Sequence, residues 1–164
     1  MISKKMQKSL SEQMVREFAS AYIYLGMAGK ATEMNLKGTA LWLEAQEAEE
    51  RSHGMKFYKY LKDQGAEIAF GSIDSASTKY GSLLDIFEKV LAHEKKVTRW
   101  IYDLVEQAHA EKDYATLAFL QWFVTEQVEE EANATEIVEQ LKMIGDKSNA
   151  IFMMDHQLGK RKAG

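Results

Sequence analysis

The chain contains no cysteine and no proline among its 164 residues. The absence of cysteine excludes a disulfide framework, a zinc finger and a thiolate-bound iron–sulfur cluster. The absence of proline removes the strongest interior helix breaker, so long uninterrupted helices are permitted. A hydrophobic content of 46% is too high for a disordered chain. Together these features favour one domain with a sizeable core.

The chain also lacks a concentration of positive charge and a long apolar run. Its 21 basic and 25 acidic residues leave a net charge of −4, and the basic ones are spread along the sequence, so we expect no nucleic-acid partner. No segment reaches the run of about 18 apolar residues that a membrane-spanning helix needs, and the first residues lack the apolar stretch of a signal peptide. We therefore expect a cytoplasmic protein with no membrane partner.

Helix start and stop signals divide the chain into five segments. Residues suited to cap a helix N-terminus or to follow a C-terminus are Ser3, Gly65, Ser82, Asp113, Gly145 and Gly159. We predict one all-α domain over residues 1–164, with helices at about 4–34, 38–64, 83–111, 114–144 and 147–158. The Ser- and Gly-rich segment 66–82 is long enough to run the length of a bundle, which makes the second and third helices parallel.

Polar residues interrupt the apolar stripe of each long predicted helix near its middle. They are Glu17 in the first helix, Gln46, Glu50 and His53 in the second, Glu94 in the third, and Gln127 and Glu130 in the fourth. Packing the four helices side by side brings these residues to one level. Buried carboxylates without partners are costly or become protonated, and no Lys or Arg lies on the stripes at this height. The layer therefore predicts bound cations.

Carboxylates with one imidazole suit iron, manganese or zinc better than magnesium or calcium, which rarely use histidine. A shift of 77 residues maps Glu17 onto Glu94, Glu50 onto Gln127 and His53 onto Glu130, as a helix pair used twice around two metals would. The repeat is imperfect, because Glu130 stands where a symmetric centre would have histidine. We therefore predict two different metal positions, one bound by Glu17, Glu50 and His53, the other by Glu50, Glu94 and Glu130.

Other acidic and aromatic residues lie near these positions. Glu49, Glu126 and Glu129 are adjacent to ligand positions and predict either a third, weaker cation site or an exit path. Tyr24 and Trp122 are packing aromatics or electron donors, and their spacing favours packing. A second Glu-x-x-His pair, Glu106 and His109, points away from the Glu94 direction of its helix, so we expect it to face solvent.

At these positions the sequence resembles bacterial non-haem ferritins. The matching stretches are Glu17 with 20–24, 49–53, His93 with Glu94, 112–116 and 119–131. The resemblance covers residues 1 to about 158. It implies a ferritin-like four-helix bundle with one long crossover loop and a short fifth C-terminal helix.

The resemblance further implies iron storage and detoxification by a ferroxidase. Two Fe(II) ions would be oxidised by O2 or H2O2 at a di-iron centre, and ferric mineral would be deposited in a hollow shell of 24 copies. The expected catalytic and metal-binding residues are Glu17, Glu50, His53, Glu94, Gln127 and Glu130, with Tyr24 beside the centre and Glu49, Glu126 and Glu129 as a third iron site. Arg51 stands where bacterioferritins carry a haem-binding methionine, so we expect no haem.

Two other functions are compatible with the pattern. A di-metal carboxylate enzyme of the oxygenase or manganese catalase type would act on another substrate and would need a channel for it. A structural bundle without metal would use Glu50 and His53 as a polar layer with satisfied hydrogen bonds.

Overall fold

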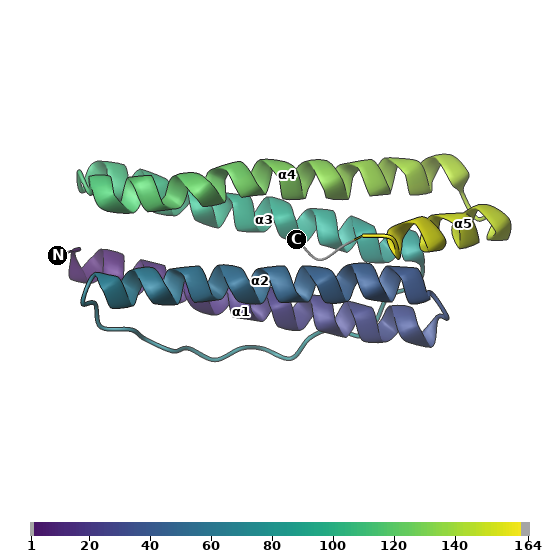
Figure 1. The fold of residues 1–164 in the computed structure, drawn as a ribbon, viewed down its shortest axis with the longest axis horizontal. Helices are drawn as coiled ribbons and strands as arrows, with labels where there is room; N and C mark the ends of the chain where they lie inside the picture. The colour runs from purple at the N-terminus through teal and green to yellow at the C-terminus, as the bar shows by residue number, and fades with distance from the viewer. Residues whose placement is uncertain (1, 162–164) are drawn as a thin grey trace.

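The computed structural model describes residues 2–161 as five helices, and four of them are long (Figure 1). The helices are α1 (Lys4–Glu33), α2 (Lys37–Asp63), α3 (Leu83–Ala110), α4 (Tyr114–Ile144) and α5 (Ser148–Leu158). Their ends differ from the ranges expected from the sequence by at most one residue. In the described residues, no helix combines the length and the hydropathy that crossing a membrane requires.

The four long helices lie side by side, and the segment between α2 and α3 runs along the outside of the α1–α2 pair (Figure 1). This long crossover makes α2 and α3 parallel, while α1–α2 and α3–α4 are antiparallel pairs joined by short turns. The crossover is tied to α1, because the backbone N–H groups of Glu67 and Ala69 donate to the side chains of Gln7 and Ser11. The all-α bundle with one long crossover and a short last helix is therefore confirmed.

Local sequence signals account for the helix ends. The hydroxyl oxygens of Ser3 and Ser82 accept hydrogen bonds from backbone N–H groups in the first turns of α1 and α3, and the Asp113 carboxylate does the same for α4. Gly65 and Gly145 follow α2 and α4 with φ of 62° and 57°, a left-handed conformation that glycine adopts without steric cost.

The α2 helix has no side-chain cap of its own, and α5 supplies one. The Asp155 carboxylate accepts from the backbone N–H groups of Gly38 and Thr39 at 3.1 and 2.7 Å. This contact requires glycine at 38, since a Cβ there would lie 1.8 Å from the Asp155 carbonyl oxygen. The N-terminus of α2 and the end of α5 are thereby held together.

The core consists of two apolar clusters, one toward each end of the bundle. One contains Leu43, Phe87 and Leu141, and the other contains Leu10 and Phe57. Buried polar residues of all four long helices lie between them, as the interrupted stripes predict. The fold therefore places a polar layer inside the bundle, away from both ends.

Candidate metal centre

Each long helix contributes one buried glutamate to this layer. Glu17 comes from α1, Glu50 from α2, Glu94 from α3 and Glu130 from α4, and none is more than 6% exposed. The helices place them there because each residue continues the apolar stripe of its own helix. Bringing four carboxylates into one dry layer is unfavourable unless cations or protons compensate their charge.

Glu17, Glu50 and His53 form the tightest part of the layer. His53 Nδ1 lies 3.5 Å from Glu50 Oε2 and 3.9 Å from Glu17 Oε2. Among the His, Asp and Glu side chains of residues 2–161, these three form the one group whose ligand atoms all lie within 4.8 Å of one another. Glu50 and His53 reach the same point because residues three apart share a helix face. The sequence-predicted first metal position is therefore assembled.

An unpartnered oxygen marks where a cation fits. Glu50 Oε2 is buried and accepts no hydrogen bond, which is costly for a carboxylate oxygen. Within the described chain, no Lys or Arg forms an ion pair with any of the four layer glutamates. A divalent metal beside Glu50 Oε2 and His53 Nδ1 would satisfy both atoms, so the donor set fits iron.

Glu94 is held from two directions. The Tyr24 hydroxyl donates to Glu94 Oε1, and Gln127 Nε2 donates to Glu94 Oε2 at 3.2 Å. Tyr24 is fully buried and meets the His93 ring edge-on. The amide nitrogen of Gln127 also lies 3.2 Å from the Thr98 hydroxyl. In this arrangement Tyr24 and Gln127 orient a carboxylate of the centre.

Glu130 is positioned by a residue of α2. Gln46 Nε2 donates to Glu130 Oε2 at 2.7 Å and lies 3.5 Å from Glu50 Oε1. Gln46 thus connects carboxylates that the sequence assigns to the second metal position. The side-chain amide oxygen of Gln46, Oε1, accepts a hydrogen bond from the guanidinium of Arg161, which follows α5.

Burial and mutual repulsion raise the pKa values of the layer carboxyls. The pKa of Glu17 is well above its ordinary value because of burial first and the Glu50 charge second. Burial also raises the pKa of Glu50, with Glu94 as the next cause, and raises that of Glu130 to about 7. Without metal, the layer therefore holds protons near neutral pH, and binding a cation must release them.

The three acids next to the ligand positions are not gathered into one cluster. The half-buried Glu49 pairs with Arg161, whose guanidinium lies 2.6 Å from Glu49 Oε2. Glu126 Oε1 lies 3.9 Å from His53 Nε2, and Glu129 is exposed. Glu126 therefore faces the ring nitrogen of His53 that points away from Glu50, as carboxylates behind a metal-binding imidazole do.

The remaining sequence expectations concern Trp122 and the second Glu-x-x-His pair. The Trp122 and His53 rings meet edge to face at a centroid distance of 5.2 Å, and Lys56 Nζ lies 4.3 Å from the Trp122 ring centroid. Glu106 and His109 are both exposed, so they face solvent as expected. This pair provides a matched surface control for Glu50 and His53.

Sequence reasoning missed two residues that orient the layer, Gln13 and Arg161, and it placed Gln46 in the layer without its orienting role. Gln13 Nε2 donates to Glu17 Oε1 at 2.7 Å, and Gln46 and Arg161 act on Glu130 and Glu49. The roles of Gln13 and Gln46 were detectable in principle, because each stands four residues before a layer glutamate on the same helix. The position of Arg161 carries no such signal, since it depends on how the chain turns after α5.

Taken together, the fold and the layer define a class of protein: a helical bundle with a buried carboxylate–histidine metal site supplied by four helices. The chain belongs to the ferritin family, whose model, described as the ferritin-like domain, matches residues 7–144.

Similarity to individual ferritins extends over nearly the whole chain. The bacterial non-heme ferritins of Staphylococcus aureus (strain MRSA252) and Staphylococcus saprophyticus are each 40% identical over 161 residues, covering 98% of this chain and 97% and 96% of theirs. Among solved structures, an open-pore ferritin from the hyperthermophilic archaeon Archaeoglobus fulgidus matches with a TM-score of 0.97 and 41% identity over 99% of both chains. A form of the Archaeoglobus fulgidus ferritin engineered to be closed matches with a TM-score of 0.98 and 41% identity over the full length of both.

Proposed function

We propose that this ferritin oxidises Fe(II) to Fe(III) with O2 or H2O2 at a di-iron centre within each chain and stores the ferric product. The observation that carries the proposal is the unpartnered Glu50 Oε2 beside His53 and Glu17. Iron is the substrate here, and each residue has a part in binding it.

Glu17, Glu50 and His53 bind the first ion, and Glu50, Glu94 and Glu130 bind the second. In this proposal Glu50 bridges the two ions: its Oε2 lies beside His53, and its Oε1 lies 3.5 Å from the Gln46 amide nitrogen that also holds Glu130. Oxidation raises the charge of each ion, and hard carboxylate ligands favour the higher charge. The Tyr24 hydroxyl and the Gln127 amide keep Glu94 aimed into the layer while this happens.

Larger-scale features complete the proposal. The chain folds as a single domain, of which residues 1 and 162–164 lie outside the described residues, and it assembles into a hollow shell of 24 copies in the cytoplasm. We also propose that Glu49, Glu126 and Glu129, which do not form one cluster in this structure, are the ligands of a third, weaker iron position on the way from the centre to the shell interior. A 24-copy shell has a mass of about 450 kDa against 18.7 kDa for one chain, so light scattering on the purified protein tests the assembly.

Fe(II) oxidation in air tests the activity. Purified protein should accelerate the growth of ferric absorbance and keep the product soluble after centrifugation. Glu50→Ala should lower the initial rate at least about tenfold, since even residues behind metal ligands typically matter by 10–100-fold. Glu106→Ala removes the same residue type from the exposed Glu-x-x-His pair and should leave the rate unchanged. A wild-type rate equal to that of iron alone in buffer would refute the proposal.

A further inference from the structure

Arg161 joins the last described residues of the chain to the metal-binding layer. Its guanidinium donates to Glu49 Oε2 at 2.6 Å and to Gln46 Oε1 at 2.7 Å, and it stacks 4.5 Å from the centroid of the Trp42 ring. The ion pair is largely sheltered from water, with side-chain exposures of 21% for Arg161 and 18% for Glu49. Such charge-assisted hydrogen bonds are stronger than neutral ones.

The fold directs Arg161 to this position. The Asp155 contact with Gly38 and Thr39 fixes α5 against the start of α2, and Gly159 packs directly on Gly38. The backbone then turns, because the Arg161 N–H donates to the Leu158 carbonyl at 3.2 Å. The side chain therefore reaches α2 from an anchored backbone.

One guanidinium thus contacts two functionally different groups. Glu49 belongs to the proposed third iron position, and Gln46 holds Glu130 of the central layer. A metal ion that binds Glu49 Oε2 needs the oxygen that Arg161 occupies, so the two cations compete. When the guanidinium leaves, Gln46 also loses the partner that fixes its amide.

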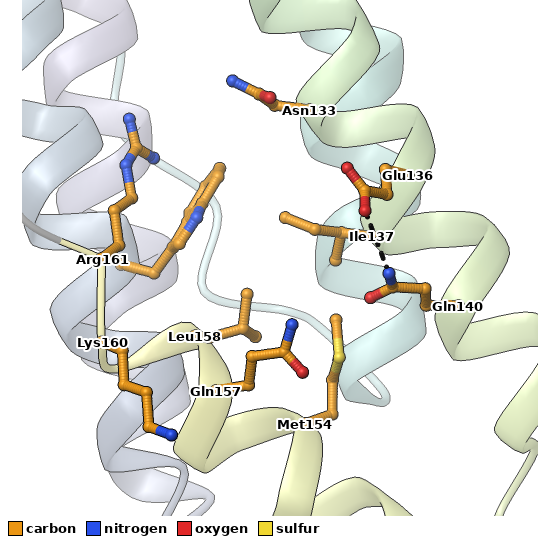
Figure 2. A pocket seen from close by; sticks show the side chains of 10 residues that line it. Asn133, Glu136, Ile137, Gln140, Met154, Gln157, Leu158, Lys160 and Arg161 are labelled. Carbon is orange, nitrogen blue, oxygen red and sulfur yellow. Dashed lines mark hydrogen bonds between the residues drawn. The ribbon is translucent and has the colours of Figure 1, made fainter.

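The structure provides space for that movement. Arg161 and Lys160 line a cavity of about 440 Å³ between α4 and α5, and Figure 2 shows Glu136 of α4 on its other side. Glu136 accepts a hydrogen bond from Gln140 at 3.1 Å. Because the cavity is open, Arg161 can change rotamer without displacing packed core side chains.

We propose that Arg161 is a displaceable latch: it occupies Glu49 in the iron-free protein and sets the affinity of the weak cation position there. Arg161 is a positioning residue, since it contacts neither of the central metal positions itself. The inference rests on the proposed function, because Glu49 matters as a cation ligand only if the layer beside it binds metal.

Anaerobic calorimetry with Zn(II) tests the latch without redox chemistry. The wild-type chain should bind two ions tightly and one weakly. Arg161→Gln should tighten the weak step about tenfold, the scale of one lost charge-assisted hydrogen bond, and leave the tight steps in place. Lys160→Gln removes the neighbouring positive charge and should leave the weak step unchanged. Arg161→Lys retains charge without the two-pronged geometry and should give an intermediate affinity.

Tryptophan fluorescence gives an independent readout. Trp122 lies against His53, so its fluorescence should change when the two tightly bound Zn(II) ions bind. Trp42 lies under the Arg161 guanidinium, so its fluorescence should change when the weakly bound ion binds. Trp42→Phe should remove only the second signal, and Arg161→Gln should do the same.

These experiments distinguish a failure of the Arg161 latch from a failure of the proposed metal centre. An unchanged weak step in Arg161→Gln, or the absence of a weak step in the wild type, overturns the latch while two tight ions preserve the proposed centre. No tight binding in the wild type overturns the centre itself. A variant that is merely damaged would bind more weakly, so tighter binding cannot arise from misfolding.

Discussion

Replacing Glu50 with glutamine should make the metal-free protein more stable while weakening its metal binding. Glu50 Oε2 is buried without a hydrogen bond, and ionising Glu50 beside Glu94 and Glu130 in a dry layer is unfavourable, as its raised pKa indicates. A glutamine amide nitrogen in that position can donate to the neighbouring carboxylate of Glu17. The opposite changes in stability and binding arise because a layer organised for cations is strained without them.

The magnitudes follow from the contacts. An unsatisfied buried polar group costs about 1–3 kcal/mol, so Glu50→Gln should gain about that amount in free energy of unfolding. For a chain of this size, each kcal/mol corresponds to about 2–4 °C in Tm. A metal at 100 times its Kd should stabilise the wild type by about 2.7 kcal/mol per site, and the variant should lose most of this gain.

The assay compares thermal unfolding of metal-free and Zn(II)-loaded protein at one protein concentration, since assembly also shifts Tm. Glu106→Gln, an exposed carboxylate in the same sequence pattern, serves as the control and should change Tm by little in either state. A metal-free Glu50→Gln variant less stable than wild type by 1 kcal/mol or more would refute the reasoning. It would favour instead a structural polar layer in which Glu50 is already satisfied.

Three further outcomes follow from the structure. Metal binding at pH 6–7 should release protons into weak buffer, because the pKa of Glu130 is raised to about 7 by burial, and the release from this group should fade above about pH 8. The same shift makes folded metal-free protein hold a proton on Glu130 that the unfolded chain loses above an ordinary pKa of 4.5. The contribution of Glu130 to stability should therefore fall as pH rises from about 4.5 to 7 and then level off, and Glu130→Gln should remove this contribution in urea denaturation. Gly38→Ala should accelerate amide hydrogen exchange in α5 and lower the free energy of unfolding by about 1–3 kcal/mol, because the new Cβ would overlap the Asp155 carbonyl oxygen. Gly29→Ala is the control and should change neither, because a Cβ at position 29 would have no atom within 4 Å. Unchanged exchange in Gly38→Ala would contradict the close contact of α2 and α5.

The helices and the location of the site were predictable because their signals are local. Caps such as Ser3 and stops such as Gly65 act within one turn, and the absence of proline leaves the helix interiors without a strong breaker. The polar layer was predictable because Glu17 and Glu94 break apolar stripes whose burial the helical period dictates.

Side-chain orientation was not predictable in the same way. Spacing places Glu49, Glu126 and Glu129 beside the layer, but it does not reveal that Glu49 turns toward Arg161. The helix stripes carry no Lys or Arg at the height of the layer, whereas Arg161 comes from the segment after α5. Its position depends on the tertiary contact between Gly38 and Gly159, which no periodicity encodes.

The pairing of Gln127 with Glu94 is a second example. Its place on the stripe indicates a residue of the centre, and the 77-residue repeat aligns it with the ligand Glu50. In the structure its amide nitrogen donates to Glu94, which is the behaviour of an orienting group. In the proposed centre, an amide and a carboxylate at equivalent positions of a repeat therefore have different roles: Gln127 orients a ligand, and Glu50 bridges two metals.

The number of Fe(II) ions bound tightly per chain under anaerobic conditions tests the central claim most directly. Calorimetry should give two in the wild type, and Glu17→Ala should remove the ion that Glu17, Glu50 and His53 bind while Glu106→Ala retains both. A wild type that binds no Fe(II) tightly, or a stoichiometry of two that persists in Glu17→Ala, would contradict the assignment of the buried layer as the iron centre.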